Sequence, residues 1–236
     1  MAILQRNKTA TGEGVALPEH QGGIPPLLHP QYLSRILIHS HDVTRFDLSP
    51  KTAPSTYPPL PFSTKFDLIL LDAHRFDTGD EHLVPWEPER MYLAQLIAAL
   101  DYIELHGVIF VRLGNIERDI TVAILYLFSL LLESVKVYKP TNAHVHRGSF
   151  YGIADGYKAS ELKDNVQTVL RNAWWESTFG GPDGAGVNPG EWWAKIFPTE
   201  ELPELFGATV VDLAVPLWQT QIRGLEQYFI KHGVVF

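Results

Sequence analysis

Three short aliphatic runs stand out along the chain, and each is bounded by polar residues or by glycine. They read RILIHS (35–40), FDLILL (66–71) and GVIFVRL (107–113). Runs that are apolar at consecutive positions, and not only at alternate ones, are typical of strands that are buried on both faces of a parallel sheet. We therefore expect three parallel strands.

A stretch with helical periodicity follows each of the last two runs. The segment 87–105 opens with acidic residues and ends before Gly107, and the segment 118–135 repeats its large apolar residues around one face. Strand and helix thus alternate along this part of the chain. That alternation predicts an α/β fold built on a parallel sheet.

Two further runs, 135–140 and 149–157, are separated by a short loop, which predicts an antiparallel hairpin at the edge of the sheet. After the hairpin the pattern is helical again, interrupted by the glycine-rich loop 179–191. We therefore divide the chain into an α/β core, residues 1–157, and a C-terminal helical extension, residues 158–236.

The composition excludes several classes of protein. With 236 residues, 45% of them hydrophobic, the chain can bury a full core, and its formal charge of -8 argues against sequence-independent binding to nucleic acid. The absence of cysteine excludes disulfides, thiolate metal sites and a cysteine nucleophile. No apolar run reaches the roughly 20 residues that span a bilayer, and no secretory leader is visible. We expect a soluble intracellular protein.

The second aliphatic run ends abruptly on an acid, Asp72. Ligands of open parallel sheets bind beyond the carboxyl ends of the strands, so Asp72 is a candidate site residue. The alternative is an N-cap or loop acid that satisfies backbone donors of a following turn, and the pattern alone does not decide between the two. His74 and Arg75 come next, and either line an acceptor pocket or lie on a solvent-facing loop.

Ten histidines raise the question of a metal site, most of all in HSH (39–41) and HVH (144–146). Two imidazoles that are two residues apart on a strand point to the same side, as ligands would. A protein zinc site needs a third clustered ligand, which neither motif supplies. We therefore expect no metal.

The six tryptophans include two adjacent pairs, at 174–175 and 192–193. Tryptophans can stack on nucleic-acid bases, or they can anchor the extension to the core. Since no cluster of Lys or Arg accompanies them, core anchoring is favoured. A nicotinamide enzyme is disfavoured too, because no G-x-G-x-x-G motif follows a strand.

Three segments, taken in order, resemble the second half of the FtsJ-type ribose 2′-O-methyltransferases. They are FDLILLDAH (66–74), the helix that leads into GVIFVRLGN (107–115), and KPTNAHVHRGSFYGIADGY (139–157); the C-terminal TFGGPDGAG (178–186) looks like the extension of fungal members. The resemblance spans the chain from about residue 12 to its end. It implies a Rossmann-like sheet of seven strands with one antiparallel strand at the edge, S-adenosylmethionine as cofactor and RNA ribose as substrate.

The resemblance also implies which residues are catalytic. Members of the family place a Lys-Asp-Lys-Glu tetrad around the ribose 2′-hydroxyl; its aspartate matches Asp72, its second lysine matches Arg112 and its glutamate matches Ser149. The first lysine has no counterpart. Arginine stays charged at any working pH, so Arg112 can orient a phosphate or a carboxylate but cannot serve as a general base. A noncatalytic pseudo-methyltransferase, acting as a binding or scaffold module, is therefore the alternative to an active enzyme.

The cofactor side implied by the resemblance is incomplete. Asp42 matches the acid that contacts the adenine amino group, with Val43 beside it. The acid of the family's second strand falls at or near Ala16, and Glu19 is close enough to replace it in principle. The glycine-rich turn that approaches the methionine part of the cofactor has no counterpart, and residues 1–7 match the end of the helix that follows that turn.

In the family's sheet the strand before that turn is central. Without it we expect two facing rows of unpaired backbone groups, each costing about 1 to 3 kcal/mol where it is buried. The strand 35–40 and its neighbour 14–18 could shift to pair with 66–71, residues 1–5 could fill the gap, or the chain could be a fragment that folds poorly by itself. We expect a truncated or degenerate family member.

Overall fold

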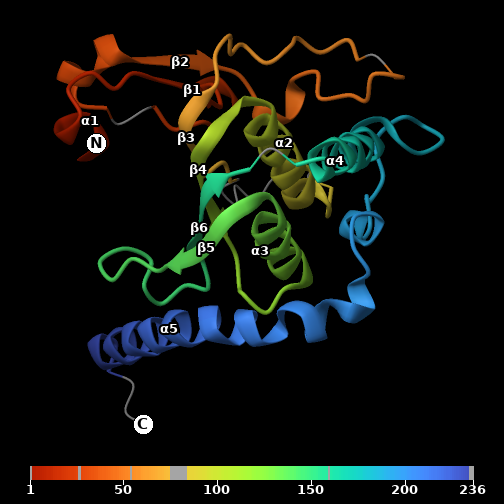
Figure 1. The fold of residues 1–236 in the computed structure, drawn as a ribbon. Coiled ribbons are helices and arrows are strands. Elements are labelled where there is room, and N and C mark those ends of the chain that lie inside the picture. The colour runs from red at the N-terminus through yellow and green to blue at the C-terminus, as the bar shows by residue number, and fades with distance from the viewer. Residues whose placement is uncertain (1, 26–27, 54, 75–83, 159, 234–236) are drawn as a thin grey trace.

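The computed structural model describes residues 2–25, 28–53, 55–74, 84–158 and 160–233 (Figure 1). Over these residues the protein is an α/β fold with a mixed sheet and a long C-terminal helix, which is compatible with the predicted Rossmann-like class. None of the helices in this part of the chain is both long and apolar enough to cross a membrane.

The strands form two sheets. A parallel pair, β1–β2, stands apart from a four-stranded sheet with the order β3-β4-β6-β5, which we call the main sheet. The strands are β1 (Gly12–Ala16), β2 (Ile36–Ser40), β3 (Phe66–Leu71), β4 (Ile103–Leu113), β5 (Leu132–Tyr138) and β6 (Phe150–Tyr157).

Five α-helices and five short 3-10 helices complete the described chain. The α-helices are α1 (Ala2–Arg6), α2 (Glu87–Tyr102), α3 (Asp119–Leu131), α4 (Leu162–Phe179) and α5 (Leu202–Lys231). The 3-10 helices are η1 (Glu19–Gln21), η2 (Pro30–Arg35), η3 (Val43–Arg45), η4 (Trp192–Lys195) and η5 (Thr199–Glu201).

The predicted parallel strands are confirmed, because β1 pairs with β2 and β3 pairs with β4 in parallel register. Several boundaries differ from the prediction: the helix predicted to reach residue 105 ends at Tyr102, and the strand predicted to begin at 107 begins at Ile103. The helix predicted to reach residue 135 ends at Leu131, and β5 begins at Leu132. Both leucines are fully buried, and no glycine or proline separates them, so the apolar pattern runs from helix to strand without a visible break.

The predicted antiparallel hairpin is confirmed as well. β6 pairs antiparallel with both β4 and β5, and β5 is the outermost strand of the main sheet. The reversed strand therefore lies one position inside the edge, and not at the edge as expected. β5 runs parallel to β3 and β4, because two reversals of direction restore the original one.

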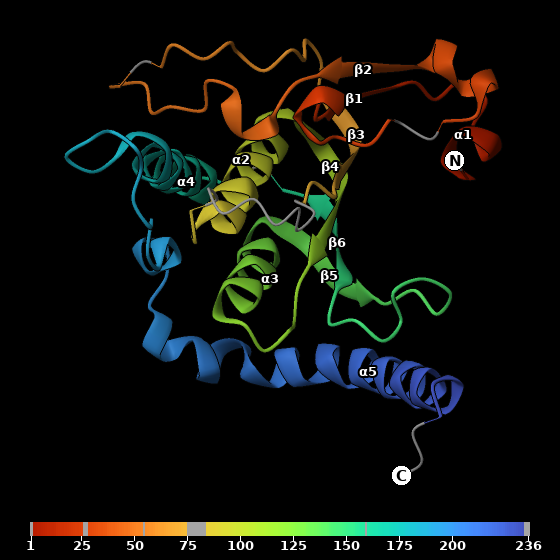
Figure 2. The same cartoon turned by 180° about the vertical axis from the view of Figure 1, so that it is seen from behind.

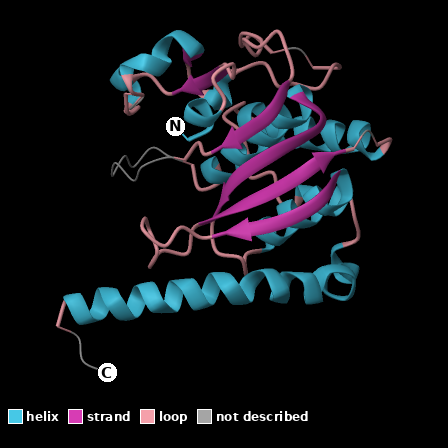
Figure 3. Ribbon diagram, turned by 60° about the vertical axis from the view of Figure 1, so that its left-hand side comes forward, coloured by secondary structure: helices cyan, strands magenta, loops and turns pink. Residues whose placement is uncertain are grey.

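Helices α2 and α3 pack against one face of the main sheet, and α4 lies on the same side, against α2 (Figure 3). Ile109, Val111 and Leu113 of β4 are at most 1% exposed on that face. A β-carbon at Gly152 of β6 would lie 3.2 Å from the side chains of Val111 and Leu113, so glycine allows this close packing. On the other face Leu70 is 62% exposed.

No strand pairs with the facing edges of β1 and β3 in the described chain, although Figures 1 and 2 both show β1 beside β3. Residues 2–6 form helix α1, so the idea that the first residues fill the gap as a strand was wrong. The alternative closure, in which the β1–β2 pair joins β3, was wrong too, since the two sheets stay separate.

The C-terminal extension is anchored to the core as its tryptophans predicted. Trp174, Trp192 and Trp193 are buried in the same hydrophobic core as the main sheet, and half-buried Trp175 packs on the ring of Phe179. Helix α4 also packs against α2, and Asp101 of α2 accepts hydrogen bonds from Gln167 and Arg171 of α4. One continuous core therefore joins the segments on either side of residue 158.

Candidate functional site

The end of β3 is fixed by a buried glutamine of helix α2. Gln95, 4% exposed, accepts a hydrogen bond from the backbone N–H of Ala73 through Oε1 at 2.9 Å. Its Nε2 donates to the carbonyl of Ala73 and to the carbonyl of Met91, each at 3.2 Å. This clamp sets where the preceding residue, Asp72, leaves the sheet. Nothing in the sequence pattern marked Gln95, because one glutamine on an apolar helix face is not a motif.

Asp72 and Arg112 meet at the carboxyl ends of two adjacent parallel strands. Leu70 is opposite Phe110 and Leu71 is opposite Val111, so continuing the register puts Asp72 opposite Arg112. A guanidinium nitrogen, Nη1 of Arg112, lies 3.5 Å from Oδ1 of Asp72. The two matched tetrad positions are therefore neighbours in space.

His74 completes this cluster. Nη1 of Arg112 lies 3.0 Å from the imidazole nitrogens of His74, and a guanidinium can only donate, so the ring nitrogen in this contact accepts. Nδ1 of His74 also lies 2.9 Å from the carbonyl oxygen of Asp72. Arg75, the other predicted pocket residue, lies outside the described residues.

The Asp72–Arg112 pair is accessible. The side chain of Asp72 is 52% exposed and that of Arg112 is 21% exposed. Ion pairs at such exposed sites contribute at most about 1 kcal/mol, so a ligand with its own negative charge can recruit the guanidinium. Among the described residues, the Asp72 carboxylate contacts Arg112 and His74.

Two tyrosines border the cluster. Tyr92 of α2 donates its phenol hydrogen to the carbonyl of Arg112 at 3.3 Å, and Tyr151 of β6 is opposite Arg112 in the register. Burial raises the pKa of both phenols, and the negative charge of Asp72 raises that of Tyr151 further, whereas Arg112 lowers both. Both phenols therefore stay neutral near neutral pH, and Tyr92 acts as a hydrogen-bond donor.

Ser149, at the position of the tetrad glutamate, precedes β6 and carries no charge. Its carbonyl accepts a hydrogen bond at 2.8 Å from Nζ of Lys139, which also donates to the carbonyl of Arg147. Lys139 is 6% exposed, and its burial lowers the pKa of the amine. Lys139, the first residue of the segment KPTNAHVHRGSFYGIADGY, therefore holds the loop between β5 and β6 in place.

Asp42 lies after β2, where the resemblance predicted an adenine contact, but its carboxylate is engaged. Oδ1 accepts hydrogen bonds from the N–H and the hydroxyl of Thr44 at 2.9 and 2.8 Å. Asp42 thus caps η3, which contains Val43, and Oδ2 lies 3.9 Å from Arg45. Exposed Glu19 lies in η1, beyond Ala16 at the end of β1.

The described residues fit S-adenosylmethionine only in part. One carboxylate oxygen of Asp42 is spent on the cap, and the described residues that precede β1, 2–11, contain no glycine and so no glycine-rich turn that would approach the methionine end of the cofactor. The chain as described supplies at most the adenine side of a cofactor site, so we derive no step through the cofactor.

The histidine motifs do not converge. Nε2 of His39 lies 3.1 Å from Glu13 across the β1–β2 pair, whereas His41 contacts the carbonyl of Arg45. His146 stacks on Tyr228 of α5. In the described ranges no three His, Asp or Glu side chains are grouped as metal ligands.

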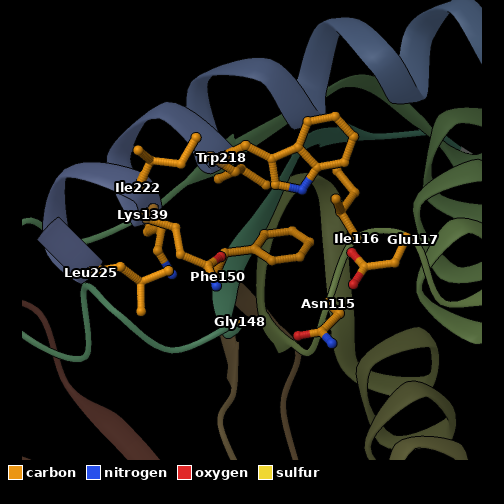
Figure 4. Close-up of a pocket in the computed structure, with 11 residues that line it drawn as sticks. Asn115, Ile116, Glu117, Lys139, Gly148, Phe150, Trp218, Ile222 and Leu225 are labelled. Carbon is orange, nitrogen blue, oxygen red and sulfur yellow. The ribbon is translucent and has the colours of Figure 1, made fainter. Parts of the chain in front are cut away.

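A cavity of about 280 Å³ opens away from this cluster, between α5 and the ends of β4 and β6 (Figure 4). Its polar lining includes Asn115, Glu117 and Lys139, and its apolar lining includes Phe150 and Trp218. Asp42, Asp72 and Arg112 are not among the lining residues. The cavity is therefore separate from the predicted site.

Comparisons with known proteins add little to this picture. No family model matches the chain, and no curated protein matches it. A solved structure described as "Alphavirus P23pro-zbd" is similar with a TM-score of 0.38 and 15% sequence identity. The similarity covers 78% of this chain and 26% of that one, so this chain spans about a quarter of that neighbour's length. We draw no argument about function from it.

Proposed function

We propose that the chain is a methyltransferase-fold domain of the FtsJ class, in which Asp72, His74 and Arg112 form the acceptor side of a ribose 2′-O-methyltransferase site. One observation carries this proposal. Asp72 and Arg112, which match two tetrad positions and are 40 residues apart in the sequence, lie 3.5 Å apart beyond adjacent parallel strands. Such strand ends are where ligands of α/β sheets bind.

The three side chains can position an RNA ribose in complementary ways. The guanidinium of Arg112 matches the geometry of a phosphate oxygen pair, and the carboxylate of Asp72 can accept the hydrogen of a ribose hydroxyl. Arg112 cannot take the hydroxyl proton, whereas a neutral imidazole can. His74 is therefore our candidate for the base that a lysine supplies in the family, in the state in which a bound phosphate has drawn Arg112 away from its ring.

A second candidate function is a noncatalytic binding module with the same fold. Three features favour it: arginine stands at the lysine position, uncharged Ser149 stands at the glutamate position, and the carboxylate of Asp42 caps η3. The net charge of -8 also opposes broad attraction to RNA. The two candidates share the fold and differ in whether the Asp72 cluster turns over a substrate.

Calorimetric titration of the folded chain with S-adenosylhomocysteine tests the cofactor side. Asp42→Asn is the matched variant, since an asparagine oxygen can still accept from Thr44 while the charge is lost. Micromolar binding that is weakened at least tenfold by Asp42→Asn supports the methyltransferase. Absence of binding by a chain with native circular dichroism favours the noncatalytic module.

Transfer of a labelled methyl group to RNA tests the acceptor side. Asp72→Asn should abolish transfer without unfolding the chain, since Asp72 is exposed, and Arg112→Lys should raise it by restoring the family's residue. Transfer that is unchanged by Asp72→Asn removes Asp72 from the mechanism. Binding of RNA without transfer in the parent chain and in Arg112→Lys identifies the noncatalytic module.

A further inference from the structure

Helix α5 lies along one side of the molecule, as Figures 1 and 2 both show. Its 30 residues extend about 45 Å at the usual rise of an α-helix. One side of α5 packs on the protein through its buried residues. They are Phe206, Ala214, Leu217 and Gly224.

A second apolar stripe follows α5 beside this buried one. Its residues are separated alternately by four and three positions, and they are Val211, Val215, Trp218, Ile222, Leu225 and Phe229. The first four are between 41 and 54% exposed. Alternating spacings of three and four define the a and d positions of a coiled coil, and we call this stripe the seam.

We propose that the seam of α5 pairs with the same seam of a second copy of this chain, as a parallel two-stranded coiled coil. In such a pair every seam residue meets its own counterpart, so one apolar stripe is enough to make a complementary interface. This inference does not depend on the proposed function.

The residues at the a positions favour two strands. Val215 and Ile222 occupy successive a positions, followed by Leu225 at d and Phe229 at the next a position, and β-branched residues at a with Leu at d favour a parallel dimer. Pro216 follows Val215 at position b, off the seam, and α5 continues through it. The seam therefore stays on one side of the helix across the proline.

The flanking residues favour the parallel arrangement. In a parallel pair each g position lies beside an e position of the second copy. Ala214 would therefore lie beside Gln219, and Gln221 beside Glu226, so no like charges meet at these pairs. An antiparallel pair centred on Gln219 would bring Asp212 close to Glu226 of the second copy, where two acids repel each other. The same acids argue against a membrane surface, which selects basic flanks.

The seam continues into the cavity under α5. Trp218, Ile222 and Leu225 line that cavity together with Ile116 and Phe150 (Figure 4). A second helix on the seam would therefore also cover the open side of the cavity. Burying both surfaces at once adds contact area beyond the helix pair alone, which brings the interface closer to the roughly 800 Å² per partner of a stable dimer.

Sedimentation of the full chain across a wide range of concentrations tests the pairing. We expect a dimer whose dissociation constant rises on the order of tenfold or more in Ile222→Glu. Ile230→Glu is the matched control, because Ile230 is 72% exposed at a b position off the seam. A parent chain that is monomeric throughout, or equal weakening by both substitutions, overturns the proposal.

Single cysteines then test the register, since the chain has none of its own. In a parallel pair Ile222→Cys meets Ile222→Cys of the second copy, and oxidised glutathione should convert it to a disulfide-linked dimer. Ile230→Cys, off the seam, should stay largely unlinked. Linking of Ile230→Cys to the same extent, or no linking of Ile222→Cys in a chain that sediments as a dimer, overturns the parallel seam.

Discussion

The main sheet and the N-terminal lobe, residues 2–45, are stabilised by different interactions. The main sheet is backed by buried aliphatic residues of β4, which are at most 1% exposed, and by α2 and α3. In the lobe every residue of β1 is half-buried. There the guanidinium of Arg35 donates hydrogen bonds to the carbonyls of Leu4, Asn7 and Ala10.

This difference separates the two halves of the proposed site. Asp72 and Arg112 project from the main sheet, which is backed by close packing, whereas Asp42 lies in the lobe, whose strand β1 is only half-buried and whose first residues are held by the hydrogen bonds of Arg35. Polar contacts in partly exposed places contribute about 1 kcal/mol each, far less than a buried aromatic side chain. The acceptor side should therefore persist under conditions in which the cofactor side is lost.

The largest expected effect comes from the core of the main sheet. Trp174→Ala removes a fully buried indole and should lower the free energy of unfolding by about 3 to 5 kcal/mol. Trp175→Ala, the same change at the half-buried neighbouring residue, should cost clearly less. Denaturation in guanidinium chloride measures both, and equal losses would contradict the burial assigned to the two indoles.

Arg35→Ala should affect the lobe and spare the main sheet. The variant leaves three carbonyls without their guanidinium partner, which should cost about 1 to 3 kcal/mol. Amide hydrogen exchange should accelerate in β1 and β2 while β4 and β6 keep their protection. Arg45→Ala, at a guanidinium 3.9 Å from Asp42, is the control. Faster exchange throughout the chain would mean that lobe and sheet unfold together.

Gln95→Met should loosen the acceptor side alone. Methionine keeps the volume of the buried side chain but removes both hydrogen bonds to Ala73, which is itself exposed and can bind water instead. We expect a loss of about 1 kcal/mol. The amide of Ala73 should exchange faster, while the amides of β2 should not change. An unaltered Ala73 amide would show that β3 holds its end without the clamp.

Strands and helices of the main sheet could be predicted from the sequence because their apolar runs are long and bounded by polar residues. The boundary between α3 and β5 at Leu131 could not be predicted, because the residues on both sides of it are apolar. Asp72 was identified as the acid that ends an aliphatic run, whereas Arg112 was identified through the resemblance, and the register of β3 and β4 brings the two together. Gln95 was missed because its role depends on a backbone 22 residues away in the sequence.

The smallest expected effect is a pH dependence of stability that arises from Tyr92, which packs against the core of the main sheet. Burial raises the pKa of Tyr92, although the Gly114 backbone and two arginines oppose that shift. Above the ordinary tyrosine pKa of about 10, the unfolded chain loses the phenol proton before the folded chain does, so stability falls as pH rises. Tyr92→Phe should remove part of this alkaline loss, and Tyr138→Phe, at an exposed tyrosine, should leave it unchanged. Unfolding midpoints measured from pH 8 to about 11 test this assignment. If the midpoints of both variants fell with pH as steeply as those of the parent chain, Tyr92 would not be the source of the alkaline loss.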